Sequence, residues 1–226
     1  MLTGEELSIL WLTLGIATAS TVAILPLGIL GAWLLSRWRG PGKGLADTIL
    51  SLPLVLPPTA VGLLLLQLLA KSGPIGRALD ALGVDVIFTW KAVVLACATM
   101  SFPLLVRPLR TAFEEIEPRL MAVARTLGRG PVDVFFRVAL PMSWRGLVTG
   151  ALLAFSRALG EFGATILIAG SIPGRTQTLS LAIFQRAESG HDNEALRLSG
   201  LTVLLAFGLM WTTELITTRR TRRLRT

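Results

Sequence analysis

Two ionisable residues stand inside an apolar stretch of the sequence, where they could pair with each other or act on an anion. Arg157 and Glu161 are four residues apart, so on a helix they share one face. Charged groups at membrane depth are costly and normally face a protein interior or a water-filled cavity. One interpretation is an ion pair that fixes helix packing. The other is that Arg157 adds positive potential to a path for a divalent anion, and the two are compatible if the pair is only partly neutralised.

Residue types that support enzymatic chemistry are scarce in this chain. His191 is the only histidine, and Cys97, the only cysteine, lies in an apolar run, so neither an internal disulfide nor a cysteine-based metal cluster can form. The glycine-rich segment 40–44 lacks both the spacing and the Ser or Thr of a phosphate-binding loop. We therefore expect no catalytic residue, no metal site and no cofactor in this chain.

The composition is that of a membrane protein. Of the 226 residues, 52% are hydrophobic and 16% are charged, whereas soluble domains carry about 25% charged residues. This balance excludes a disordered chain, a fibrous repeat and a nucleic-acid-binding module. The net charge of +8 could suggest a nucleic-acid partner, but the basic residues flank the apolar runs and are better explained as a topology signal.

Five apolar runs are candidates for membrane spans, which take about 20 residues each. The third is short and contains Pro103, and the segment Thr178 to Arg186 is too short to cross, so it is expected to form a sixth, re-entrant or interfacial helix. We predict an all-α integral membrane fold in which residues 1–226 form one transmembrane domain. Five helices enclose little, so a solute pathway would need a second copy or a partner. The predicted spans lie near residues 9–35, 49–70, 92–106, 147–168 and 198–216.

The distribution of basic residues predicts the orientation. Most of the 22 lysines and arginines follow the first, third and fifth runs, including the cluster from Arg219 to Arg225. Because basic loops are retained in the cytoplasm, we expect the carboxyl terminus to be cytoplasmic and the amino terminus, with Glu5 and Glu6, to be outside.

The connection between the third and fourth runs, about residues 107–146, predicts two short helices on the cytoplasmic face. Residues 119–127 favour helix, and Gly128 supplies a left-handed stop. Pro131 then suits a first helical position, with Asp133 in that first turn, and Pro141 closes the second helix.

Two adjacent aromatic residues, Phe135 and Phe136, stand on the second of these helices. Neighbouring side chains on a helix point about 100° apart, so one face cannot easily bury both. Either an exposed ring enters a groove of a partner protein, or both rings pack beneath the chain's own spans; the pattern alone leaves these alternatives even.

Prolines interrupt the second run at positions 53, 57 and 58. A proline leaves a carbonyl unpaired, which a membrane tolerates only where protein or water satisfies it. This helix is therefore expected to line an interior, where its polar residues serve a path or cap the backbone. Together with polar residues of the third and fourth runs, the candidates for a translocation path or gate are Ser51, Thr59, Ser101, Arg157, Glu161 and Thr165.

The segment from Ala122 to Gly128, followed nine residues later by Val138 to Pro141, resembles the EAA loop of bacterial ABC-importer permeases. Ala124, Gly128, Val138, Leu140 and Pro141 match that motif, whereas Ala122 and Val123 replace its usual Glu and first Ala. The resemblance implies a coupling helix seated in a cleft of an ATP-binding subunit, with Asp133, Phe135 and Phe136 taking part in that contact.

Four segments together resemble the molybdate permease family of these importers: residues 51–62, 101–107, 124–128 and 157–165. The family resemblance implies a MetI-like fold and a permease that moves molybdate across the bacterial inner membrane by alternating access. Its implied partners are a second copy of the chain, two ATP-binding subunits that hold ATP and Mg, an extracytoplasmic molybdate-binding protein and membrane lipid, with no nucleic acid.

Other functions are weighed against this one. Sulfate/thiosulfate permeases share part of the Gly160–Gly163 element, so sulfate, thiosulfate or tungstate are alternative substrates. An ion-coupled secondary transporter would show repeated halves and intramembrane proton sites, and only Glu161 is deep. An intramembrane hydrolase would need a serine or metal constellation, which the spans lack.

Overall fold

The computed structural model describes residues 3–209 and 211 with their side chains, and the backbone as far as Thr221. All secondary structure in this part of the chain is helical. The helices are, in order, α1 (Gly4–Arg37), α2 (Lys43–Val55), α3 (Pro58–Leu69), α4 (Pro74–Ala81), α5 (Trp90–Glu114), α6 (Pro118–Thr126), α7 (Pro131–Val134), the π-helix η1 (Phe135–Ala139), α8 (Leu140–Met142), α9 (Trp144–Leu159), α10 (Gly163–Ala169), α11 (Leu179–Glu188) and α12 (Asp192–Thr221).

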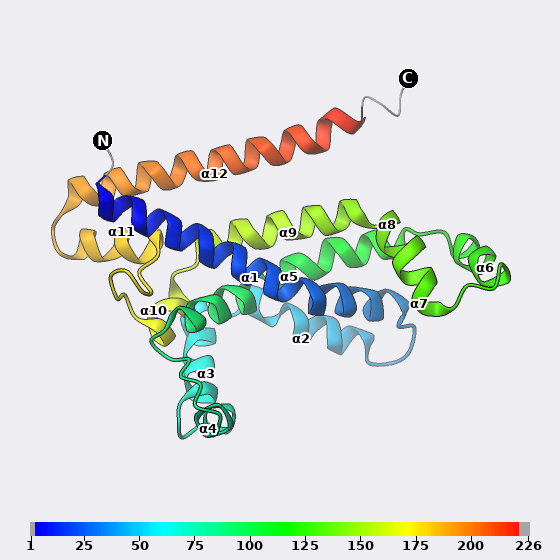
Figure 1. Cartoon of the computed structure of the whole chain (residues 1–226), viewed down its shortest axis with the longest axis horizontal. Helices are drawn as coiled ribbons and strands as arrows, with labels where there is room; N and C mark the ends of the chain where they lie inside the picture. The colour runs from blue at the N-terminus through cyan, green and yellow to red at the C-terminus, as the bar shows by residue number, and fades with distance from the viewer. Residues whose placement is uncertain (1–2, 222–226) are drawn as a thin grey trace.

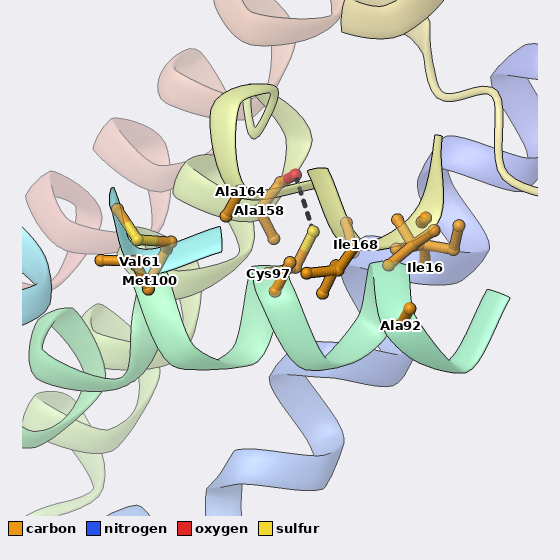
Figure 2. Close-up of a cluster of buried hydrophobic side chains, with 12 residues drawn as sticks. Ile16, Val61, Ala92, Cys97, Met100, Ala158, Ala164 and Ile168 are labelled. Atoms are coloured by element: carbon orange, nitrogen blue, oxygen red, sulfur yellow. Dashed lines mark hydrogen bonds between the residues drawn. The ribbon is translucent and has the colours of Figure 1, made fainter. Parts of the chain in front are cut away.

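Helix α5 is the centre of the bundle, packed along both α1 and α9 (Figure 1). Small residues let the backbones approach closely: a Cβ atom on Gly150 of α9 would lie 2.6 Å from the carbonyl oxygen of Leu105. One core cluster joins α1, α3, α5, α9 and α10 and consists of small and branched side chains together with one methionine (Figure 2). Its labelled members are Ile16, Val61, Ala92, Cys97, Met100, Ala158, Ala164 and Ile168. Helix approach through small residues is the usual basis of packing within a membrane.

The membrane spans differ in kind. Helices α1 and α5 are each long and apolar enough to cross a membrane. Two further spans arise if each of two bent pairs counts as one: α2 with α3, bent by 108°, and residues 131–142 with α9, bent by 68°. The fifth predicted span, near 198–216, falls within α12, but most of its second half lies outside the residues with described side chains, as do Arg219 to Arg225.

Three of the predicted spans need correction. The second is broken between Val55 and Pro58, because successive prolines cannot continue the hydrogen-bond ladder. The third is longer than expected and runs to Glu114 through Pro103 and Pro108, held on both sides by α1 and α9. The fourth stops at Leu159 and resumes as α10. The short helix expected near 178–186 is confirmed as α11.

The two ends of the bundle are distinct (Figure 1). Helices α6, α7 and α8 gather at one end, and α11 lies with the start of α1 at the other. Helices α3 and α4 project to the side, where Lys71 Nζ lies 2.7 Å from an oxygen of Asp80. This hydrogen bond raises the pKa of Lys71 above its ordinary value, and the charges of Asp80 and Asp85 act in the same direction.

Candidate functional site

The connection between α5 and α9 folds as the two short helices that the sequence predicts. Helix α6 ends at Thr126, and Gly128 takes a φ of +80°, a left-handed conformation that suits glycine. Pro131 then occupies the first turn of α7 with Asp133 beside it. The second helix continues through η1 and α8 to Met142, one residue beyond Pro141, and the chain then bends by 68° before α9.

The two adjacent phenylalanines differ in exposure, although their rings lie edge to face with centroids 4.9 Å apart. The ring of Phe135 lies against Trp33 of α1 and near Phe113 of α5, with centroid distances of 5.0 and 6.2 Å. Phe136 is 59% exposed. The expectation that both rings enter a partner's groove is therefore corrected: Phe135 anchors the helix to the bundle, and Phe136 is the ring that is free to meet another protein.

Exposed apolar side chains lie on or beside both short helices of this connection. We name this set of side chains the docking face, and its members are Leu120, Val123, Leu127, Val132 and Phe136. On the opposite side of the same helices Met121 and Val134 are buried, and Ala124, Val138 and Leu140 pack against the inner cluster. The connection is thus amphipathic, with one side fixed to the bundle and the other apolar and uncovered.

Asp133 makes ion pairs with an arginine of the turn before α7 and with one further along the second helix. One carboxylate oxygen lies 2.8 Å from Arg129 and the other lies 2.5 Å from Arg137. Because Arg129 precedes α7 and Arg137 lies within η1, the carboxylate ties the turn after Gly128 to the helix that carries Phe136. Because both arginines are half exposed or more, these pairs are expected to contribute little to stability.

The interior pair of Arg157 and Glu161 is formed, as the packing interpretation predicts. Nη2 of Arg157 lies 2.7 Å from Oε2 of Glu161, whose side chain is 1% exposed. The structure corrects one point: Glu161 stands in the break after α9 and not within a continuous helix. There its Oε1 accepts a hydrogen bond of 2.8 Å from the backbone amide of Ala164 and so stabilises the start of α10.

The two broken spans meet at their breaks, which the sequence did not reveal. A Cβ atom on Gly163 would lie 2.8 Å from Cβ of Pro58, and one on Gly62 would lie 2.8 Å from both Cα and O of Ala164. Helices α3 and α10 therefore touch backbone to backbone. The sequence shows the prolines of the second run and the spaced glycines of the fourth run, but it does not show that these segments touch. Only the tertiary structure reveals that contact.

The candidate path residues do not form one site. Thr59 is exposed at the start of α3, close to the break where Arg157 and Glu161 lie, and Thr165 is buried on α10. Ser101 is buried on α5, one turn from Cys97, whose Sγ lies 3.7 Å from the carbonyl oxygen of Ala158 (Figure 2). Ser51 stands apart on α2 and receives a hydrogen bond from Arg107.

A polar network between α2 and α5 was also missed by the sequence reasoning. Arg110 pairs with Asp47 and lies 3.5 Å from Glu114, which in turn lies 3.1 Å from Lys43. The four-residue spacing of Arg110 and Glu114 was the one local signal available, because the contacts with α2 cross more than 60 positions of sequence.

Comparison with known families and sequences gives a consistent result. A family model described as "Binding-protein-dependent transport system inner membrane component" matches residues 24–221. The "Molybdenum transport system permease protein ModB" of Escherichia coli K12 is 44% identical over 208 residues, which cover 91% of this chain and 91% of that protein. The protein of the same name from Haemophilus influenzae is 39% identical over 97% of this chain and 96% of its own length.

A sulfate relative matches less of its own length. The "Sulfate transport system permease protein CysT" of Salmonella typhimurium is 40% identical over 161 residues, which cover 71% of this chain but 58% of that protein.

Solved structures confirm the fold predicted from the sequence. A bacterial ABC transporter involved in the import of alginate aligns over 97% of this chain and 81% of its own, with a TM-score of 0.75 and 16% identity. The inward-facing MetNI methionine ABC transporter aligns over 91% of both chains, with a TM-score of 0.65 and 18% identity.

Proposed function

The chain belongs to the binding-protein-dependent transport system inner membrane components, and on that premise we propose that it is the permease subunit of an ATP-driven importer of molybdate. The observation that carries the substrate is the identity of 39 to 44% to permeases of molybdenum transport systems over nearly the whole chain. Sulfate, thiosulfate and tungstate are the competing substrates, and the sulfate relative matches less of its own length.

The docking face is the contact for the ATP-binding subunit in this proposal. An exposed apolar surface on a helix pair fits a groove in a partner protein. Movement of a partner that holds Phe136 is passed to α1 and α5 by Phe135, whose ring contacts Trp33 and lies near Phe113. ATP and Mg are bound by that partner, and the states of this chain shift because the partner prefers one of them.

The meeting point of α3 and α10 is the proposed gate. Since these helices touch backbone to backbone, they move as one unit about their two breaks. Arg157 and Glu161 hold the break beside α9 in place. Thr59, Ser101 and Thr165 remain proposed residues of the path, which requires a second copy of the chain to complete it.

The proposed assembly is a homodimer with two ATP-binding subunits and an extracytoplasmic molybdate-binding protein. The assembly lies in the bacterial inner membrane, where residues 1–226 form one transmembrane domain. The amino terminus is outside, and the carboxyl terminus lies with α6 to α8 on the cytoplasmic side, as the excess of basic residues at that end supports.

The test is reconstitution of the permease in proteoliposomes with its ATP-binding subunit and binding protein. We expect radiolabelled molybdate uptake that requires ATP and that a tenfold excess of sulfate leaves largely unchanged. Equal competition by sulfate would reassign the substrate, and uptake driven by an ion gradient without ATP would place the chain among secondary transporters.

A further inference from the structure

A polar cavity lies between α2 and α5 at the end of the bundle that carries the docking face. Its volume is about 320 Å³, which is more than enough for several water molecules or a small anion. Its polar lining is made by Asp47 and Ser51 of α2 and by Arg107, Arg110 and Thr111 of α5. This space admits a small hydrated anion.

Among the described side chains around the cavity, one cation has no ion-pair partner. Arg110 is paired with Asp47 and also lies near Glu114, and Glu114 pairs with Lys43. Arg107 makes no ion pair with any residue whose side chain the structure describes, and its side chain is exposed. The cluster therefore has a net positive charge at Arg107.

The hydrogen bonds of Arg107 also leave its guanidinium available to an anion. Nη2 of Arg107 donates to Oγ of Ser51 at 2.7 Å, and that hydroxyl donates to the carbonyl oxygen of Asp47 at 2.7 Å. A guanidinium carries five N–H donors, so most of those on Arg107 have no acceptor here. Nε of Arg110 is buried and lies 3.5 Å from Oε1 of Glu114, so it already faces a carboxylate. Because Arg107 is exposed, its remaining donors are open to water or to an anion that accepts several hydrogen bonds.

We propose that the cavity between α2 and α5 binds a tetrahedral oxyanion, with Arg107 as its principal ligand. The planar fork of a guanidinium matches two oxygens of such an anion, and a charge-assisted pair of this kind is stronger than a bond to a neutral hydroxyl. The anion takes the place of Ser51 as the acceptor of the Arg107 hydrogen bond.

Two sources can supply this chemistry: the transported oxyanion on its way to the cytoplasm, and the phosphate of an anionic phospholipid. The first rests on the proposed function, because only a molybdate permease brings molybdate to this cavity. The second does not depend on the substrate of the transporter.

The test measures equilibrium binding to the purified complex of permease and ATP-binding subunits, without binding protein, in nanodiscs. One arm uses phosphatidylcholine nanodiscs and radiolabelled molybdate; the other uses nanodiscs with graded phosphatidylglycerol and counts the lipid retained by native mass spectrometry. We expect Arg107→Gln to weaken binding of one of these probes at least tenfold and Arg107→Lys to weaken it less. The matched control is Arg175→Gln, because Arg175 is also exposed and makes no ion pair among the described side chains.

The two arms of the experiment distinguish molybdate from phospholipid as the bound anion. They also distinguish failure of this proposal from failure of the proposed function. A loss confined to molybdate identifies the transported anion, and a loss confined to phosphatidylglycerol identifies the lipid. The proposal is overturned if Arg107→Gln, in an assembled complex, leaves both probes bound as in the parent. If the parent binds phosphatidylglycerol through Arg107 but never transports molybdate, the proposed function fails while the site stands.

Discussion

At the scale of single residues, the carboxylate of Glu161 makes two different contacts. It pairs with Arg157 and accepts the amide of Ala164, while almost wholly buried. Such a group is stable only as long as its charge is compensated, because removing one partner of a buried pair leaves an unpaired charge in a medium of low polarity. The pair is therefore a point at which small changes have large effects.

We predict that Arg157→Gln is more damaging than Glu161→Gln. The first change strands the buried carboxylate and should lower the free energy of unfolding by about 3–5 kcal/mol. The second keeps an acceptor for Ala164 and leaves Arg157 partly exposed to water, so about 1 kcal/mol is expected. SDS-induced unfolding in mixed micelles, followed by tryptophan fluorescence, measures both.

The double variant Arg157→Gln with Glu161→Gln is the control. It should recover much of the loss caused by Arg157→Gln alone, because no buried charge remains. Additive losses would mean that the two side chains act independently.

Phe135 and Phe136 provide a second comparison at this scale. Phe135→Ala removes a ring that lies against Trp33 and near Phe113, so the free energy of unfolding should fall by about 3–5 kcal/mol. Phe136→Asp changes an exposed ring and should leave unfolding within about 0.5 kcal/mol. It should instead abolish co-purification of the ATP-binding subunit and ATP-dependent uptake. Retained association would remove the docking face from the proposed mechanism.

At the scale of elements, two interrupted helices form one packed unit. Prolines separate α2 from α3, and the Glu161 carboxylate accepts a hydrogen bond from the first turn of α10. The two helices α3 and α10 can touch because Gly62 and Gly163 have no side chains. Interrupted helices inside a membrane persist where protein surrounds the freed backbone groups. The contact between α3 and α10 therefore helps to stabilise the interruptions in both spans.

We predict that Gly62→Ala destabilises the protein although alanine is the better helix former. The new Cβ would lie 2.8 Å from the backbone of Ala164, which cannot move aside cheaply, so a loss of about 1–3 kcal/mol is expected. Gly15→Ala on α1 is the control, because no atom lies within 4 Å of its Cβ position. That control should gain up to about 1 kcal/mol. Equal effects on SDS unfolding would contradict the close contact.

At the scale of the whole molecule, the two ends of the bundle differ, and in our proposal one of them meets the ATP-binding subunit. The docking face, the polar network of α2 and α5 and many of the basic residues share that end, whereas α11 and the start of α1 occupy the other (Figure 1). Force applied at the docking face reaches the bundle through α5, the helix against which α1 and α9 both pack.

We predict the orientation in a form that labelling can check. In a Cys97→Ala background, which removes the only cysteine, Arg129→Cys should react with a membrane-impermeant maleimide only after the cells are permeabilised. Asp192→Cys should react in intact spheroplasts, since α12 begins at the opposite end. Both should label fully in detergent. The reverse pattern would invert the proposed topology.

The sequence by itself determined the class of the fold, the approximate places of most spans, the helix–glycine–helix form of the connection after α5, and the pairing of Arg157 with Glu161. These features depend on apolar length, on proline and glycine chemistry and on contacts four residues apart, all of which are local. Only the tertiary structure decided that Phe135 turns inward while Phe136 stays exposed, that α3 meets α10 and that Arg107 faces Ser51. Each of these contacts joins segments distant in sequence, and its geometry follows from how whole helices pack, which no local pattern encodes.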